Sequence, residues 1–295
     1  MCGYDLRIPS DRKSIIGLNS LKIISFGPRP LNFLACNAPI QQLYNLGVEI
    51  EENSELDLFE AFHKHAGDER IPAIVKEMEE ELGAGNKKPE ILAKLAQYEL
   101  TLKDWVEEHR GYREYVAIAG KCWPAFQTQF GFVPCYVNSR LTAQGIPVSC
   151  EVDIYGALSE FIGTVVSEDT VTLLDINNNV PTDLYKEDIE GKFNYTQKDT
   201  FMGFHCGNTA ASKLSFCEMK HQLIMARALP EEVTQEHWKE ISCLEILHSS
   251  DCRAHLTTNY VLILHREKCF RWQHVPSVQS VFLQFLRWED FTAMY

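Results

Sequence analysis

Short apolar stretches alternate with longer amphipathic ones through the first 166 residues, and no other feature constrains the fold as strongly. Apolar residues dominate Leu21–Phe26 and Tyr115–Gly120, and shorter runs at residues 48–50 and 146–148 predict two further strands. Helices are expected between these strands. Strands that alternate with helices are typical of a parallel sheet covered by helices.

The helical stretches are defined by apolar residues that recur every three or four positions. They are expected over residues 54–65, 74–82, 89–105, 137–145 and 154–166. Gly83 suits the end of the second helix, and Pro89 suits the first position of the third. The Glu and Lys residues of these two helices are expected on a solvated face. The fold class is therefore α/β, with a Rossmann-like parallel sheet covered by helices over residues 21–166.

A second domain is expected after this sheet. Thr170–Leu174 predicts a strand, and the chain from Asn177 to Thr200 is polar and loop-rich. A short apolar strand that begins at Phe201 then leads into a loop of small residues. Residues 167–235 are therefore expected to begin a catalytic, β-rich domain, and residues 1–20 are expected to be a leader.

Composition excludes several classes of function. The net charge of −13 argues against nucleic acids and anionic membranes as partners. The sequence contains no run of 18 apolar residues, so no membrane span is predicted. The sequence has no secretory signal, no G-x-G-x-x-G for a dinucleotide and no P-loop. The ten cysteines are scattered without a C-x-x-C pair, which argues against zinc ribbons and favours reduced thiols in the cytoplasm.

Two acidic residues, Glu151 and Asp175, each follow a predicted strand, with one predicted helix between them. The carboxyl ends of parallel strands meet at one edge of the sheet, where α/β proteins bind ligands. Two carboxylates that converge there can hold a hard divalent metal ion or move protons. Glu151 and Asp153 also suit the positive end of the next helix, and Asp175 suits a turn, so the structural alternatives stay open.

Other polar residues stand at the ends of predicted strands. His205 precedes a small-residue loop that contains Asn208 and Thr209, which suit either a hydroxylated ligand or turn capping. Trp123 follows the strand at Tyr115–Gly120 and suits either stacking on a sugar or a place in the core. These residues alone do not decide between the two alternatives.

Four stretches resemble the L-fucose/L-arabinose isomerase family. They are Cys122–Phe126 (CWPAF), Gly145–Gly156 (GIPVSCEVDIYG), Val171–Asn178 (VTLLDINN) and Phe204–Thr209 (FHCGNT), and the resemblance covers roughly residues 20–235. Members of this family interconvert aldoses and ketoses, usually with manganese, and work as oligomers. The resemblance implies that Glu151 and Asp175 bind Mn²⁺, or another divalent cation such as Mg²⁺, and relay protons. It implies a metal-binding or substrate-binding role for His205 and sugar contacts for Asn208, Thr209 and Trp123.

The last 60 residues differ in composition from the rest. They contain none of the 16 glycines but three of the five tryptophans and five of the ten histidines. Suppose the same nucleotides are read from the third base of each codon. With permitted synonymous codons, the residues from Gln235 onward then become GTLEGDIVPGDITFFRLQST. This peptide has the alternation of apolar and polar residues and the turn residues that are typical of β-structure. We therefore expect residues 236–295 to be a frameshifted tail outside the family pattern.

The resemblance also implies that this chain lacks the family's first domain and its last metal-binding histidine. The expected function is metal-dependent aldose–ketose isomerisation of a pentose or deoxyhexose through an ene-diol, with weak or no turnover by this chain alone. A sugar-binding or metal-binding module without catalysis is the alternative.

Overall fold

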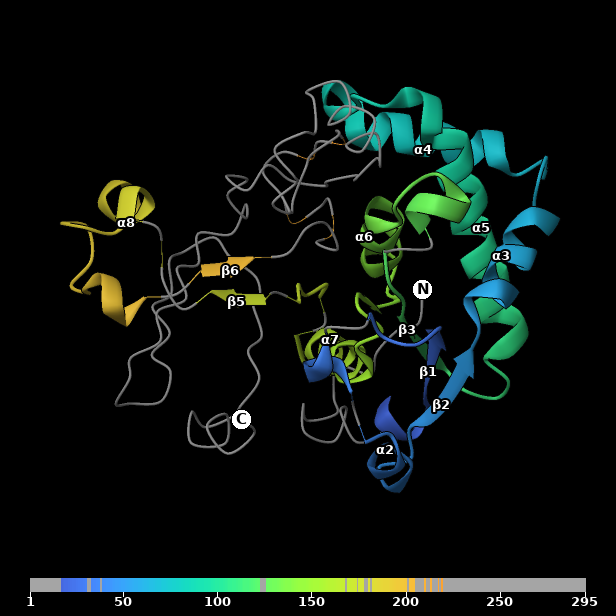
Figure 1. The fold of residues 1–295 in the computed structure, drawn as a ribbon, viewed down its shortest axis with the longest axis horizontal. Coiled ribbons are helices and arrows are strands. Elements are labelled where there is room, and N and C mark those ends of the chain that lie inside the picture. Colours follow the sequence, from blue (N-terminus) through green and yellow to red (C-terminus); the bar gives the residue numbers. More distant parts are fainter. Residues whose placement is uncertain are drawn as a thin grey trace, which may run out of the picture.

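The computed structural model describes residues 17–30, 33–37, 39–122, 126–167, 169–173, 175–177, 180, 182–200, 202–204, 210, 213, 217 and 219. Four parallel strands form its main sheet in the order β2-β1-β3-β4 (Figure 1). Their bounds are Leu21–Phe26 for β1, Glu49–Asn53 for β2, Tyr115–Ala119 for β3 and Val148–Ser149 for β4. The predicted α/β class and parallel sheet are confirmed.

Helices cover both faces of this sheet. One face packs against α3 (Glu55–Lys64), α4 (Ile71–Leu82), α5 (Leu92–His109) and α6 (Cys135–Ala143), and the other against α2 (Gln41–Asn45) and α7 (Ile154–Ser167). Strand β1 supplies both cores, because alternate side chains of a strand point to opposite faces. Leu21 and Ile23 pack against the α2 and α7 face, and Ile24 and Phe26 against the other.

The helices that the sequence predicts are present with shifts of a few residues at their ends. Local signals explain where they begin: Ser54 caps α3 in a capping box with Asp57, and Pro72 lies in the first turn of α4. The expected solvated face of α5 is partly wrong, because Glu99 is fully buried. No helix in the described part of the chain is long and apolar enough to cross a membrane.

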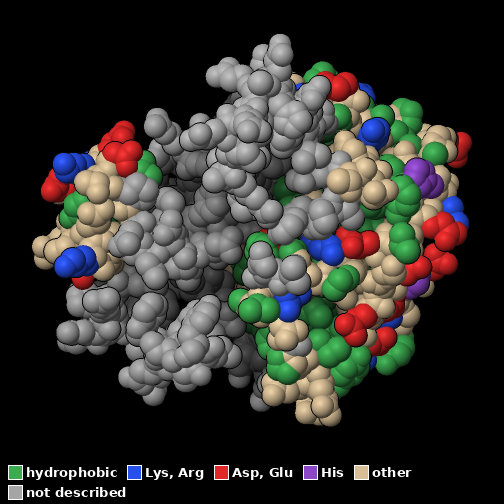
Figure 2. All heavy atoms as spheres, viewed as in Figure 1, with side chains coloured by type: hydrophobic (Ala, Val, Ile, Leu, Met, Phe, Trp, Pro, Cys, Tyr) green, Lys and Arg blue, Asp and Glu red, His purple; other side chains and the backbone are tan. Residues whose placement is uncertain are grey.

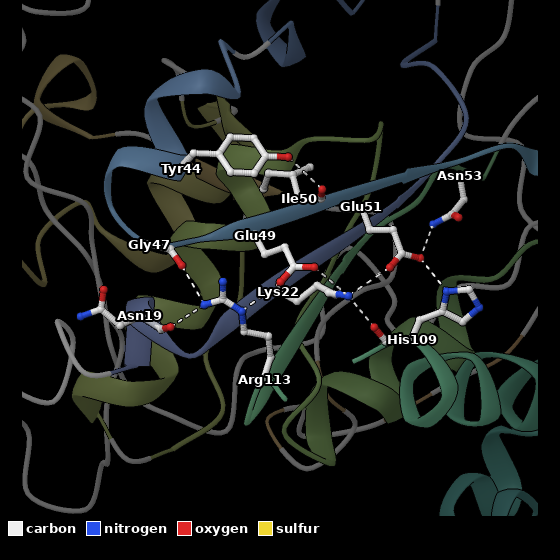
Figure 3. Close-up of polar contacts among 10 residues, drawn as sticks. All are labelled: Asn19, Lys22, Tyr44, Gly47, Glu49, Ile50, Glu51, Asn53, His109 and Arg113. Carbon is white, nitrogen blue, oxygen red and sulfur yellow. Dashed lines mark hydrogen bonds and ion pairs between the residues drawn. The ribbon is translucent and has the colours of Figure 1, made fainter. Parts of the chain in front are cut away.

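A polar network covers the start of the sheet, where β1 and β2 meet the end of α5 (Figure 3). Lys22 is buried, with 6% of the residue exposed. Its ammonium group lies 3.0 Å from Glu49 Oε1 and 3.2 Å from Glu51 Oε2. His109 contacts Glu51 at 2.8 Å, and Arg113 contacts Glu49 at 3.0 Å. Because β2 is an edge strand of this sheet, its paired charges also disfavour pairing with another chain.

The chain beyond α7 departs from the predicted order. The strand expected at Thr170–Leu174 is wrong, since residues 170–173 are not strand, and a short strand β5 (Asp175–Asn177) follows instead. It pairs antiparallel with β6 (Met202–Phe204), to one side of the main sheet in Figure 1. The expected loop at 177–200 contains a short helix, α8 (Thr182–Asp188). The proposed frameshifted tail lies outside the described residues.

Acidic and basic side chains are interspersed over the described surface seen in Figure 2. Several form ion pairs: Arg70, in the connection between α3 and α4, contacts Asp68 in the same connection and Asp104 on α5, both at 2.7 Å.

Candidate functional site

Glu151 lies at the carboxyl edge of the main sheet, directly after β4 and Cys150. Its backbone is left-handed, with φ of 55°, and Val152 follows with φ of 56°. Left-handed conformations are unfavourable for side chains with a Cβ, and most unfavourable for a β-branched residue such as Val. Strained residues of this kind cluster at ligand and catalytic sites, which makes Glu151 a site candidate on structural grounds.

Four hydrogen bonds hold this turn in place. The Val152 N–H donates to the Gly120 carbonyl at 2.7 Å, which ties the turn to the end of β3, and the Asp153 N–H donates to the Cys150 carbonyl at 2.9 Å. The Ser149 hydroxyl donates to the Asp153 carbonyl at 2.7 Å. The Gly156 N–H donates to Asp153 Oδ1 at 2.9 Å, so Asp153 serves the start of α7 as the structural alternative predicted.

The thiol groups of Cys122 and Cys150 lie near Glu151 and interact with its charge. A hydrogen bond between Cys122 and Cys135 raises the pKa of the Cys122 thiol well above its usual value, and burial and the Glu151 carboxylate add to the effect. The pKa of Cys150 is also raised, by its hydrogen bond with Cys122 first and then by burial and nearby charge. These thiols therefore stay protonated and unreactive at neutral pH. Their negative neighbour Glu151 is half-buried, which suits a carboxylate that binds a cation.

The ends of β1, β2 and β3 are joined beside this turn by Lys121. Its side chain is 6% exposed; Nζ lies 2.9 Å from Glu55 Oε2 and donates to the Pro28 carbonyl at 2.8 Å. Gly27, at φ of 80°, makes the close approach possible, since a Cβ there would lie 2.7 Å from Glu55 Cγ. Lys121 and Glu55 were missed by the sequence analysis. The position of Lys121 directly after the predicted strand Tyr115–Gly120 was the available signal.

Asp175 begins β5 rather than following a strand, which corrects its predicted position. The backbone of Asp175 pairs with Phe204, the residue before His205. Two residues before Asp175, Leu173 Cδ2 lies 2.8 Å from the place of a Gly156 Cβ. The chain that leads into Asp175 therefore passes over the first turn of α7, which begins just after Glu151.

The remaining predicted site residues are Trp123, His205, Asn208 and Thr209, and all four lie outside the described residues. Within the described part of the chain, no group of three or more His, Cys, Asp or Glu side chains is arranged to hold a metal ion. The roles predicted for Trp123, His205, Asn208 and Thr209 stay predictions.

No family model matches the chain, but relatives with assigned names do. Over 149 residues the chain is 34% identical to a protein named sulfoquinovose isomerase from Priestia aryabhattai and to one from Priestia megaterium. A sulfoquinovose isomerase of Clostridium sp. (strain MSTE9) is 31% identical over 156 residues. Half of this chain is similar to sugar isomerases. The matches cover 49–50% of this chain and 32% of each relative, so the chain spans about a third of the length of these relatives.

These similarities agree with the predicted resemblance at the level of sugar isomerases. They do not support fucose or arabinose in particular, because the relatives are named for sulfoquinovose, a third sugar.

Proposed function

We propose that this chain carries part of the active site of a metal-dependent aldose–ketose isomerase that acts on a sugar in the cytoplasm. The observation that supports it most is the position of Glu151, at the carboxyl edge of a parallel sheet and in a turn that is strained and yet tightly held. The similarity of half the chain to sugar isomerases supplies the reaction class.

The reaction needs a base beside the reacting carbon. Converting an aldose to a ketose removes the proton from C2, forms an ene-diol and returns a proton to C1, while the hydroxyl proton moves from O2 to O1. In this proposal Glu151 and Asp175 relay these protons. Glu151 is suited to the role because the bond from Val152 to Gly120 fixes its backbone against β3.

The residue types fit a divalent metal ion. Glu151 and Asp175 offer carboxylate oxygens and His205 an imidazole, a set that suits Mn²⁺ or Mg²⁺. A bound ion of this kind stabilises negative charge that develops on the substrate oxygens. In the same proposal His205, Asn208, Thr209 and Trp123 contact the sugar, and neighbouring subunits of a homo-oligomer complete the site.

Titration with Mn²⁺ followed by electron paramagnetic resonance tests the metal site, because bound Mn²⁺ loses the sharp signal of the free ion. We expect one strong site per chain, weakened at least about tenfold by Glu151→Gln or Asp175→Asn, since each change removes a charged ligand. Glu187→Gln changes an exposed carboxylate on α8 by the same chemistry and should leave the titration unchanged.

The same samples, assayed for conversion of aldoses to ketoses, separate catalysis from binding. Mn²⁺ binding with isomerisation supports the enzyme, and binding without isomerisation supports the non-catalytic module. Mn²⁺ binding that Glu151→Gln and Asp175→Asn leave intact would contradict the proposed site.

A further inference from the structure

Gly120, the residue that follows β3, lies against the turn that carries Glu151. Its N–H donates to the Ser149 carbonyl at 3.1 Å, which continues the pairing of β3 with β4. Its carbonyl accepts a hydrogen bond from the Val152 N–H at 2.7 Å. These two bonds reach the chain on either side of Glu151, so the position of Gly120 sets the position of the Glu151 backbone.

Cys122, two residues further along the chain, contacts the same turn. Its thiol is hydrogen-bonded to the thiol of Cys150, the residue before Glu151. Residues 120–122 therefore meet the turn at both of their ends. Lys121 lies between the two contacts, so whatever anchors Lys121 also places this segment.

The side chain of Lys121 is anchored to the neighbouring strands. It is 6% exposed, and its ammonium group lies 2.9 Å from Glu55 Oε2 and donates to the Pro28 carbonyl at 2.8 Å. Pro28 follows β1, and Glu55 begins α3 directly after β2. Since β1 and β4 flank β3 on opposite sides, one buried cation connects the loops after β1 and β2 to the segment that holds the turn after β4.

A second buried lysine has a similar environment at the other end of the sheet. Lys22 is also 6% exposed, and its ammonium group contacts the carboxylates of Glu49 and Glu51 (Figure 3). These contacts lie toward the opposite ends of the strands from Glu151. Lys22 and Lys121 are therefore matched in burial and in pairing with carboxylates, and they differ in which end of the sheet they hold.

Resting on the proposed isomerase function, we propose that Lys121 is a positioning residue for Glu151. Its ammonium group fixes residues 120–122 against the loops after β1 and β2, and these residues fix the turn after β4. The carboxylate of Glu151 is thereby held in place for the metal ion. Because Lys121 is buried and bonded to Glu55 and Pro28, its role is to orient Glu151 and not to contact the substrate.

Lys121 has two effects on a metal site at Glu151, and they have opposite signs. Its positive charge repels a cation, so removal of the charge alone would strengthen Mn²⁺ binding. Its anchorage orients Glu151, so loss of the anchorage weakens Mn²⁺ binding. Groups that orient metal-binding side chains typically contribute about 10–100-fold to metal affinity. The direction of the change in affinity therefore distinguishes positioning from electrostatics.

Mn²⁺ titration of the full chain by electron paramagnetic resonance tests the proposal in three variants. Lys121→Met removes the ammonium group, and the double change Lys121→Met with Glu55→Met removes both partners, which leaves the net charge unchanged and no carboxylate stranded. We expect both variants to bind Mn²⁺ about tenfold more weakly. Lys22→Met should leave Mn²⁺ affinity unchanged. Urea denaturation measures the stability of each variant, which we expect the double change to recover.

Hydrogen exchange of the Val152 amide, followed by NMR, examines the turn without a metal ion. This N–H is bonded to Gly120, so we expect it to exchange about tenfold faster in the double variant than in the unchanged chain. Lys22→Met provides the comparison for any general loss of stability, because it changes a buried lysine far from the turn.

Mn²⁺ affinity that is unchanged or higher in the double variant would overturn the proposal, as would an equal loss of affinity in Lys22→Met. The proposed function fails separately, if the unchanged chain binds no Mn²⁺. Exchange of the Val152 amide then decides alone: faster exchange in the double variant than in Lys22→Met supports the positioning of Glu151 by Lys121, and equal exchange overturns it.

Discussion

At the scale of the residue, the backbone conformation of the turn at Glu151 destabilises the folded state. Left-handed backbone costs about 1–2 kcal/mol per residue with an ordinary side chain, and Asn or Gly would adopt it more readily. Glu151 and Val152 both adopt it. Stability therefore does not explain a glutamate at position 151, which agrees with the proposed role for its carboxylate.

Glu151→Asn separates the two effects. Asn tolerates the left-handed region, so we expect the free energy of unfolding to rise by about 0.5–1 kcal/mol while Mn²⁺ affinity falls. Urea denaturation and the Mn²⁺ titration measure the two quantities. A variant that is both less stable and unchanged in Mn²⁺ affinity would show that Glu151 serves the fold.

Glu160 is a second residue whose charge conflicts with its position. It is 2% exposed on α7, and neither carboxylate oxygen makes a full hydrogen bond. Burial raises its pKa from 4.5 to about 8, while the nearby Thr142 hydroxyl and Val148 backbone offset part of that effect.

This shift predicts the pH dependence of stability. Because the folded pKa lies above the unfolded one, the folded state holds a proton that the unfolded state has released, and stability falls as pH rises from 4.5 to about 8. The loss amounts to roughly 4 kcal/mol at the upper end. Denaturation of Glu160→Gln across this range should show a flatter profile than that of the unchanged chain, and Glu114→Gln, at an exposed position, should not. An unaltered profile in Glu160→Gln would refute the assignment.

At the scale of the element, a buried ion pair joins α5 to α6. Arg140 Nε lies 2.7 Å from Glu99 Oε2, with side chains 6% and 0% exposed, and Arg140 also contacts Glu77 and Glu81 on α4. Burial acts to raise the pKa of Glu99, but its hydrogen bond and ion pair with Arg140 outweigh this and leave the pKa lowered. One guanidinium group therefore connects three helices.

Removing one partner should cost far more than removing both. Arg140→Met leaves the buried carboxylate of Glu99 with contacts to Lys103 and to the amide of Gln144, and we expect a loss of about 3–5 kcal/mol. The double change Arg140→Met with Glu99→Met should recover much of it, because the fully buried carboxylate is removed together with its cation. Urea denaturation of the single and double variants decides the matter. Equal stabilities would mean that Arg140 contributes through packing alone.

Sequence patterns predicted the elements whose stability is local. The apolar stripes of α3, α4 and α7 and the apolar runs of β1 and β3 appear within a few residues of their expected bounds. The strand expected before Asp175 was wrong because a strand needs a partner, and the partner of β5 is β6, about 25 residues later. Glu99 was expected in solvent because helical periodicity does not reveal that Arg140 faces it.

In the candidate site, too, features that depend on local sequence were predicted and features that depend on distant contacts were not. Glu151 was predicted as a polar residue after a strand, and the structure describes it there. Its left-handed turn could not be predicted, because that turn depends on a hydrogen bond to Gly120 from a distant strand. The contact between Lys121 and Glu55 was missed for the same reason, since it joins residues far apart in the sequence.

At the scale of the whole molecule, the strand order sets where chemistry can occur. The order β2-β1-β3-β4 gathers Gly27, Glu55, Lys121 and Glu151 at one edge, while the network of Lys22, Glu49 and Glu51 lies toward the opposite ends of the strands (Figure 3). We therefore expect a ligand to bind at the carboxyl edge of the sheet, whereas the network at the other ends of the strands stabilises the fold. The proposed metal site requires Asp175 to join Glu151 at the first of these edges.

The most direct test is a crystal of the chain grown with Mn²⁺. Diffraction is measured at a wavelength that gives an anomalous signal from manganese, which locates the ion relative to Glu151 and Asp175. We predict one strong manganese peak, with carboxylate oxygens of Glu151 and Asp175 both at about 2.0–2.3 Å, in the range of metal–carboxylate bonds. A peak bound to only one of these carboxylates, or manganese found only at other positions, would contradict the proposed metal site.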